Sequence, residues 1–153
     1  MKKENEMPRE FKTILCPTDF SQDSARAIEY GVRFAKISDG TVILAHIIHV
    51  PSGELYQSVR PTLNFADATA RAHALLEDIR QQHAAGYPKC ELVVEIGDPY
   101  EQLVAIATRR NVDVIVTATH GRSGLEHLVM GSVAEKIIRH APCPVFVVRR
   151  GAA

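Results

Sequence analysis

Cysteine is scarce in this sequence of 153 residues, which contains 3 cysteines and no C-x-x-C pair. A sparse, odd set of cysteines predicts reduced thiols rather than a disulfide framework. Without clustered cysteines or histidines, we expect no metal site. Cys16 and Cys143 lie in apolar segments that resemble strands, so we interpret both as small buried hydrophobic residues.

An excess of charge and a long apolar run are also missing. Lysine and arginine number 18, and aspartate and glutamate also number 18, so the formal net charge is zero. Proteins that bind nucleic-acid phosphates carry a basic excess, and we therefore expect no nucleic-acid partner. Apolar stretches such as residues 42–48 are far shorter than the roughly 18 residues that indicate a membrane span. Residues 1–6 are charged and lack the apolar centre of a signal peptide, so we expect a cytoplasmic protein with no membrane association.

What the sequence does contain is the composition of one globular domain, with 46% hydrophobic and 24% charged residues. Residues 1–10 show little periodicity, and we predict that they form a mobile N-terminal tail. The domain is then expected to span residues 11–150.

Short β-branched apolar runs alternate with stretches in which apolar residues recur three and four positions apart. The expected strands are residues 13–16, 41–50, 91–96, 112–118 and 144–148. Residues 51–61 are expected to form a loop, because they contain a Ser-Gly pair and two prolines. The helix after this loop is expected to face the core with Phe65, Ala68, Ala72, Leu75 and Ile79.

Strict alternation of strands and helices predicts the α/β class. Parallel strands need crossover connections, and helices supply them here. We expect a single doubly wound domain, Rossmann-like, with a five-stranded parallel sheet and helices on both faces. In such sheets, ligands bind beyond the carboxyl ends of the strands, where the strand order reverses.

Two loops that follow predicted strands have unusual compositions. The first covers residues 17–21, and the second runs from residue 118 to residue 124 and continues to a helix start at residues 131–133. Glycines in the second loop let backbone amides approach an anion, and free amides at the start of a helix favour phosphate. The alternative is a loop whose glycines only turn the chain, with Ser132 as an ordinary N-cap, and spacing alone favours neither interpretation.

The second loop is not a Walker P-loop, since no G-x-x-x-x-G-K-[ST] sequence exists and no lysine occurs between Lys89 and Lys136. His120 and His127 flank the glycines, but no third group is in place to orient either as a base. We therefore assign no catalytic residue. His46 and His49 are interpreted as packing residues of the second strand.

These segments resemble the universal stress protein family, and the resemblance extends over residues 11–149. It is strongest at residues 14–21, 119–122 and 131–135, and the ending at residues 141–145 is also similar. The nucleotide-binding branch of that family carries G-x2-G-x9-G-[ST]. Gly121, Gly131 and Ser132 match this pattern, whereas Ala118 stands at the first glycine.

The resemblance implies ATP as the ligand, with or without Mg²⁺, bound at the loops after strands one and four. The binding residues that it implies are Pro17, Thr18, Asp19, Ile47, Ala118, His120, Gly121, Arg122, Gly124, Gly131, Ser132 and Val133. Asp19 would accept hydrogen bonds from the ribose or adenine, or alternatively it is a carboxylate satisfied locally at a helix start. Ala118 allows phosphate to approach if its φ is negative and weakens binding if its φ is positive.

The resemblance also implies the biological role. We expect a stress-response protein that acts as a nucleotide-dependent regulator and pairs as a homodimer through its last strand, at Val145, Phe146, Val147 and Val148. An unpaired strand of this kind at a sheet edge would invite aggregation, which supports the dimer physically. Two alternatives remain open, namely a slow ATPase and a dimeric scaffold that binds no nucleotide.

Overall fold

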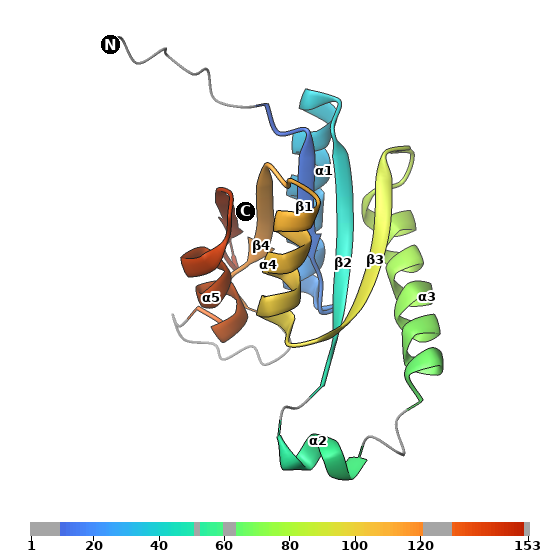
Figure 1. Cartoon of the computed structure of the whole chain (residues 1–153). Helices are drawn as coiled ribbons and strands as arrows, with labels where there is room; N and C mark the ends of the chain where they lie inside the picture. Colours follow the sequence, from blue (N-terminus) through green and yellow to red (C-terminus); the bar gives the residue numbers. More distant parts are fainter. Residues whose placement is uncertain (1–9, 51–52, 60–63, 121–129, 152–153) are drawn as a thin grey trace, which may run out of the picture.

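The computed structural model describes residues 10–50, 53–59, 64–120 and 130–151, so nearly all of the predicted N-terminal tail lies outside the described residues. Strands and helices alternate along the chain, and one additional short helix precedes α3 (Figure 1). The elements are β1 (Thr13–Pro17), α1 (Gln22–Ser38), β2 (Thr41–His49), α2 (Glu54–Val59), α3 (Phe65–His83), β3 (Cys90–Gly97), α4 (Pro99–Arg109), β4 (Val114–Ala118), α5 (Ser132–His140) and β5 (Val145–Val148).

The five strands form one sheet in the order β3-β2-β1-β4-β5, and every pairing is parallel. The predicted α/β fold with a five-stranded parallel sheet is therefore confirmed. After β3 the chain returns to the other side of β1, so the strand order reverses between β1 and β4. This is the position at which open parallel sheets bind their ligands.

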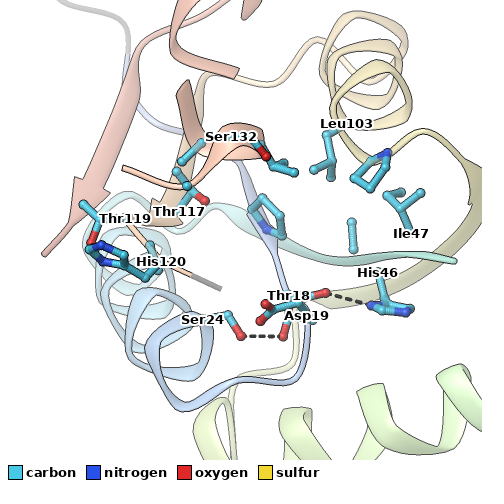
Figure 2. A pocket seen from close by; sticks show the side chains of 17 residues that line it. Thr18, Asp19, Ser24, His46, Ile47, Leu103, Thr117, Thr119, His120 and Ser132 are labelled. Carbon is cyan, nitrogen blue, oxygen red and sulfur yellow. Dashed lines mark hydrogen bonds between the residues drawn. The ribbon is translucent and has the colours of Figure 1, made fainter. Parts of the chain in front are cut away.

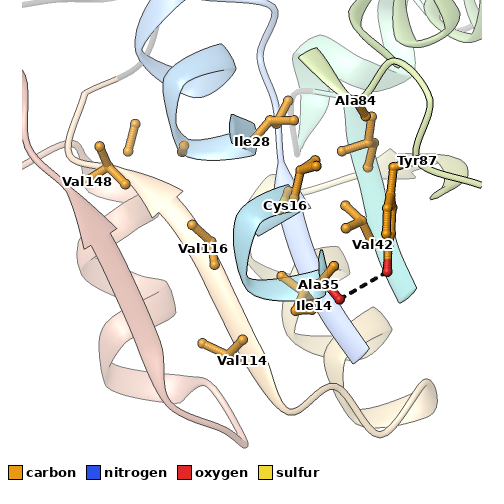
Figure 3. Close-up of a cluster of buried hydrophobic side chains, with 14 of the residues drawn as sticks. Ile14, Cys16, Ile28, Ala35, Val42, Ala84, Tyr87, Val114, Val116 and Val148 are labelled. Carbon is orange, nitrogen blue, oxygen red and sulfur yellow. Dashed lines mark hydrogen bonds between the residues drawn. The ribbon is translucent and has the colours of Figure 1, made fainter. Parts of the chain in front are cut away.

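Helices cover both faces of the sheet, as predicted, and alternate residues of each strand face opposite cores. Ile14 and Cys16 pack under α1 and α3, whereas Leu15 packs under α4 and α5. Figure 3 shows the first core, where the hydroxyl of Tyr87 donates a hydrogen bond to the carbonyl of Ala35 at 3.1 Å. Burial on both faces explains why the central strands are almost continuously apolar.

Cys16 is fully buried, as predicted, and burial raises the pKa of its thiol. It packs directly against α1, because a Cβ atom added at Gly31 would overlap Cys16 Sγ. Cys143 is only half-buried, so it is less buried than predicted. The three cysteines are unpaired, and burial raises the pKa of Cys90 to about 11.

Side chains cap the starts of α1, α3 and α4. The side chain of Ser21 accepts a hydrogen bond from the amide of Ser24, and Asn64 does the same for Asp67. Asp98 accepts from the amide of Glu101 at 3.2 Å. Each cap satisfies one of the amides that a helix start leaves without a partner inside the helix.

Two segments differ from the sequence-based expectations. The predicted loop at residues 51–61 contains the helix α2, whose six residues include no glycine or proline. In α3 it is Leu76 that is fully buried, while Leu75 is 45% exposed. The buried stripe continues from Ala72 by four residues, which keeps it on one side of a helix that repeats every 3.6 residues.

Strand ends account for two smaller corrections. Strand β4 begins at Val114 rather than at residue 112, because the amide of Val112 donates to the carbonyl of Ala107 at the end of α4. His49, predicted to be a packing residue, is exposed at the last position of β2.

Within the described ranges, none of the helices combines the length and apolarity that crossing a membrane requires.

Candidate functional site

A cavity of about 360 Å³ opens at the carboxyl ends of β1, β2 and β4, and residues from α4 and α5 close its other sides (Figure 2). It lies where the strand order reverses, at the position expected for a doubly wound sheet. The predicted site residues that line this cavity are Pro17, Thr18, Asp19, Ile47, Ala118, His120, Gly131, Ser132 and Val133. Gly121, Arg122, Gly124 and the flanking His127 lie outside the described residues.

The cavity also has lining residues that the sequence-based prediction missed. Among these residues are Ser24, His46, Pro99, Leu103, Thr117 and Thr119. Apart from Ile47 on the second strand, the prediction considered only the loops after strands one and four and the helix start that follows. The helix that follows the third strand also begins at this edge of the sheet, and that signal would have indicated Pro99.

The loop after β1 is held by a closed set of hydrogen bonds around the buried residues Thr18 and Ser24. The hydroxyl of Ser24 donates to the carbonyl of Ser21 at 2.8 Å, so it can only accept in its 2.9 Å contact with the hydroxyl of Thr18. The amide of Thr18 donates to the carbonyl of Ala45 on β2 at 2.8 Å. These bonds fix one wall of the cavity before any ligand binds.

Asp19 lies at the turn between β1 and α1, and its carboxylate accepts a hydrogen bond from the amide of Ser21 at 3.0 Å. The local contact expected of a helix-start carboxylate is therefore present, and Asp19 lines the cavity as well. The next residue, Phe20, has a φ of 67°, which is uncommon for a residue with a side chain. Its amide donates to Thr18 Oγ1 at 3.0 Å. Backbone strain of this kind is concentrated at functional sites.

His46 packs against this loop, as predicted for a histidine with a satisfied ring nitrogen. Its Nδ1 lies 2.8 Å from the carbonyl of Thr18, and its ring centroid is 4.3 Å from that of Phe20. Because a carbonyl oxygen can only accept, Nδ1 carries a proton. The two contacts tie β2 to the loop after β1.

Ala118 ends β4 and is 9% exposed where it lines the cavity. Among the described residues, the non-glycine residues with positive φ are Phe20, Asp39 and Asn111, so Ala118 has a negative φ. The alanine therefore adds one methyl group without straining the backbone. The condition for phosphate to approach at this position is met.

Beyond Ala118, Thr119 contacts both β5 and the start of α5. The amide of Thr119 donates to the carbonyl of Val148 on β5 at 3.1 Å, and its own carbonyl accepts from the amide of Gly131 at 2.7 Å. The hydroxyl of Thr119 lies 2.8 Å from Nδ1 of His120. Thr119 thus ties the end of β4 to the start of α5.

The start of α5 differs from the starts of the other long helices. Gly131 is its N-cap with a φ of −59°, and no side chain among the described residues caps the helix. Ser132 is the first helical residue, so it is not an ordinary N-cap. The first-turn residues Ser132 and Val133 line the cavity, and within the part of the chain that the structure describes no side chain caps their amides.

The lining of the cavity therefore combines two kinds of surface. The side chains of Ile47 and Leu103 are apolar, and the start of α5 has backbone amides that no described side chain caps. The positive end of a helix dipole attracts anions. This arrangement suits a ligand that has a flat, partly apolar ring and an anionic tail.

The model of the universal stress protein family matches residues 10–149. The chain is similar to universal stress protein MJ0577 from Methanocaldococcus jannaschii, at 27% identity over 155 residues, 92% of this chain and 96% of that protein. The solved structure of MJ0577 aligns with a TM-score of 0.81 and 31% identity. The alignment covers 95% of this chain and 100% of the MJ0577 chain.

Two further solved structures share the fold. One is a universal stress protein in complex with cAMP, with a TM-score of 0.69 and 24% identity over 92% of this chain and 98% of that chain. The other is a universal stress protein family member from Arabidopsis thaliana with AMP bound, with a TM-score of 0.62 and 22% identity over 92% of this chain and 93% of that chain. At these identities the likeness concerns the fold.

Proposed function

Since this chain belongs to the universal stress protein family, we propose that it is a cytoplasmic stress-response protein that binds ATP and acts as a nucleotide-dependent regulator. The binding site is the cavity between the carboxyl ends of β1 and β4. The observation that carries the proposal is the start of α5, where Gly131 leaves the first-turn amides without a side-chain cap beside that cavity.

The phosphates bind at this helix start. Free amides and the positive end of the helix dipole together attract a phosphate group. The side chain of Ser132 adds a hydroxyl donor, and Gly131 has no Cβ to obstruct the approach. A Cβ at Gly131 would lie 3.3 Å from the carbonyl oxygen of Thr119. Gly121, Arg122 and Gly124 complete the phosphate site in this proposal.

The nucleoside occupies the apolar part of the cavity. Ile47 contacts the base, and Pro17 and Thr18 form the adjoining wall. The carboxylate of Asp19 accepts hydrogen bonds from the ribose or the adenine. The cavity volume of about 360 Å³ falls in the range of roughly 300–1,000 Å³ typical of small-molecule sites.

The structural neighbours support a nucleotide, because one is in complex with cAMP and another has AMP bound. The more specific part of the proposal is that this nucleotide is ATP. It rests on the uncapped start of α5, which offers several donors for a charged tail, and on the matched residues Gly131 and Ser132. Mg²⁺ would accompany the phosphates, as it does in many nucleotide sites.

The test is a calorimetric titration of ATP into the wild-type protein and a Ser132→Asp variant. A carboxylate at this position repels phosphate but stabilises the start of a helix, so ATP affinity is expected to fall about tenfold or more with no loss of folding stability. Ala66→Asp is the matched control, since it places the same charge in the first turn of α3, at an exposed residue outside the cavity lining.

Two results would contradict the proposal. Absence of ATP binding to the wild-type protein at millimolar nucleotide would favour the scaffold that binds no nucleotide. Equal ATP affinities of Ser132→Asp and the wild type would show that the phosphates do not bind at the start of α5. Mass spectrometry of ligand extracted from the purified protein distinguishes ATP from AMP and cAMP.

The proposal includes a homodimer paired through the last strand, Val145–Val148. Strand β5 is at the edge of the sheet, and Phe146 on it is 41% exposed. An exposed edge strand with an aromatic residue is stabilised by pairing with a second copy. Sedimentation equilibrium is expected to give about twice the chain mass of 16.9 kDa, and a monomer mass at micromolar concentration would contradict it.

A further inference from the structure

A second cavity of about 270 Å³ adjoins the first, and Pro99, Ser132 and Val133 line both. We call it the annex. Its remaining lining residues are His49, Asp98, Tyr100 and Lys136. The annex therefore shares the start of α5 with the proposed phosphate site and extends from it toward α4, beside which α5 lies (Figure 1).

Lys136 is the lysine that lines the annex. It follows Ser132 by four residues on α5, so the two side chains share one face of the helix. Long side chains on helices lean toward the N-terminus, which directs the ammonium of Lys136 toward Ser132. Its Nζ lies 5.2 Å from the ring centroid of Tyr100, and this contact holds it at the annex.

The other charged groups of the annex do not neutralise this ammonium. Asp98 accepts a hydrogen bond from the amide of Glu101, and its charge is offset by the positive end of α4. His49 is an exposed imidazole at the end of β2. Among the ion pairs of the described residues, none includes Lys136. The annex therefore offers a positive charge to a ligand.

We propose that Lys136 binds the terminal phosphates of the nucleotide in the annex and thereby makes the site prefer a nucleoside triphosphate to a monophosphate. This inference rests on the proposed function. The single phosphate of a nucleoside monophosphate binds at the amides of Ser132 and Val133 and reaches no further. The second and third phosphates of ATP extend beyond these amides, where they need space and a positive charge. The annex provides both on the side of Lys136.

The inference explains how a nucleotide site works without a P-loop lysine. No lysine lies between Lys89 and Lys136 in the sequence, so none is available from the glycine-containing segment. Lys136 comes from the second turn of the same helix whose first turn receives the phosphates. It is a specificity-determining residue in this arrangement, with no role in the chemistry of hydrolysis.

The experiment measures the dissociation constants of ATP, ADP and AMP for the wild type, Lys136→Met and Lys136→Arg by calorimetry. Loss of a charged hydrogen bond is expected to weaken ATP about tenfold in Lys136→Met, with AMP changed less than about twofold. Lys136→Arg is expected to restore most of the ATP affinity. The ATP effect should shrink as salt rises, because Lys136 is exposed.

Lys36→Met is the matched control, since Lys36 is an exposed lysine in the last turn of α1, outside both cavities. It should leave all three affinities unchanged. If wild type binds ATP while Lys136→Met weakens ATP and AMP equally, or weakens neither, the lysine inference is overturned and the proposed function stands. If the wild type binds no nucleotide, both are overturned.

Discussion

Gly31 and Gly131 stand on helices that cover opposite faces of the same sheet, and the space around them differs. Gly31 lies in the middle of α1, where an added Cβ would overlap Cys16 Sγ. Gly131 is the N-cap of α5, and among the described residues an added Cβ there would meet the carbonyl oxygen of Thr119, at 3.3 Å. Both have backbone conformations outside the positive-φ region that favours glycine, so space distinguishes them.

The difference separates a glycine that packing requires from one that packing tolerates. At Gly31 the helix touches β1 so closely that only a hydrogen atom fits. At Gly131 an added Cβ would lie 3.3 Å from the carbonyl oxygen of Thr119, so a small shift of that neighbour admits a side chain, and an ordinary N-cap residue there would stabilise α5. The absence of such a cap leaves amides open beside the cavity, in agreement with the proposed phosphate site.

The largest expected effect is on folding. Gly31→Ala forces the methyl group against Cys16, and overpacking of this kind is expected to lower the free energy of unfolding by about 3 kcal/mol. Neither Gly31 nor Cys16 lines the cavity at the carboxyl ends of the strands, so the nucleotide affinity of the folded fraction should stay the same. Urea denaturation followed by circular dichroism measures the stability.

The partner variant is Cys16→Ala, which opens space beneath α1. Alone it costs stability through the cavity it leaves. Combined with Gly31→Ala, it should restore part of the loss, so the double variant is more stable than the sum of the single effects predicts. Strict additivity would show that contact with Cys16 is not the reason for the glycine.

A smaller effect is expected at Gly131, and it concerns ATP affinity rather than folding stability. The branched side chain of Gly131→Val covers the first-turn amides, so ATP affinity should fall about tenfold, or about 1.4 kcal/mol. A φ of −59° is open to any residue, and the loss of folding stability should stay below about 1 kcal/mol. Calorimetry and urea denaturation on one sample give both values. If Gly131→Val unfolds as easily as Gly31→Ala while binding ATP normally, the comparison fails.

Local patterns predicted the elements well where the signal lies within a few residues. The apolar runs at residues 13–16 and 91–96 indicated two strands, and both are present in the structure as β1 and β3. Periodicity predicted α3 but selected Leu75 where Leu76 is buried, since neighbouring leucines both fit a loose stripe. The helix α2 was missed because glycine and proline on either side of a short segment dominate a pattern-based interpretation.

The candidate site was predictable to the extent that its residues follow strands. Thr18, Asp19 and Ser132 come from such loops, and they line the cavity. Thr117 lies within a strand and Leu103 within a helix, and no local signal distinguishes them from core residues. Whether Ala118 obstructs phosphate depended on a backbone angle, which a single residue type does not reveal.

The order of residues was enough to define which segments become strands and helices, because caps, apolar spacing and turn residues act over short stretches of chain. It did not define which strands become neighbours. Only folding places β1 beside β4, and so brings Asp19 and Gly131 to one cavity and Lys136 beside Pro99. The physical reason is that burial of both sheet faces is a property of the whole packed chain, and the position of a ligand site follows from that packing.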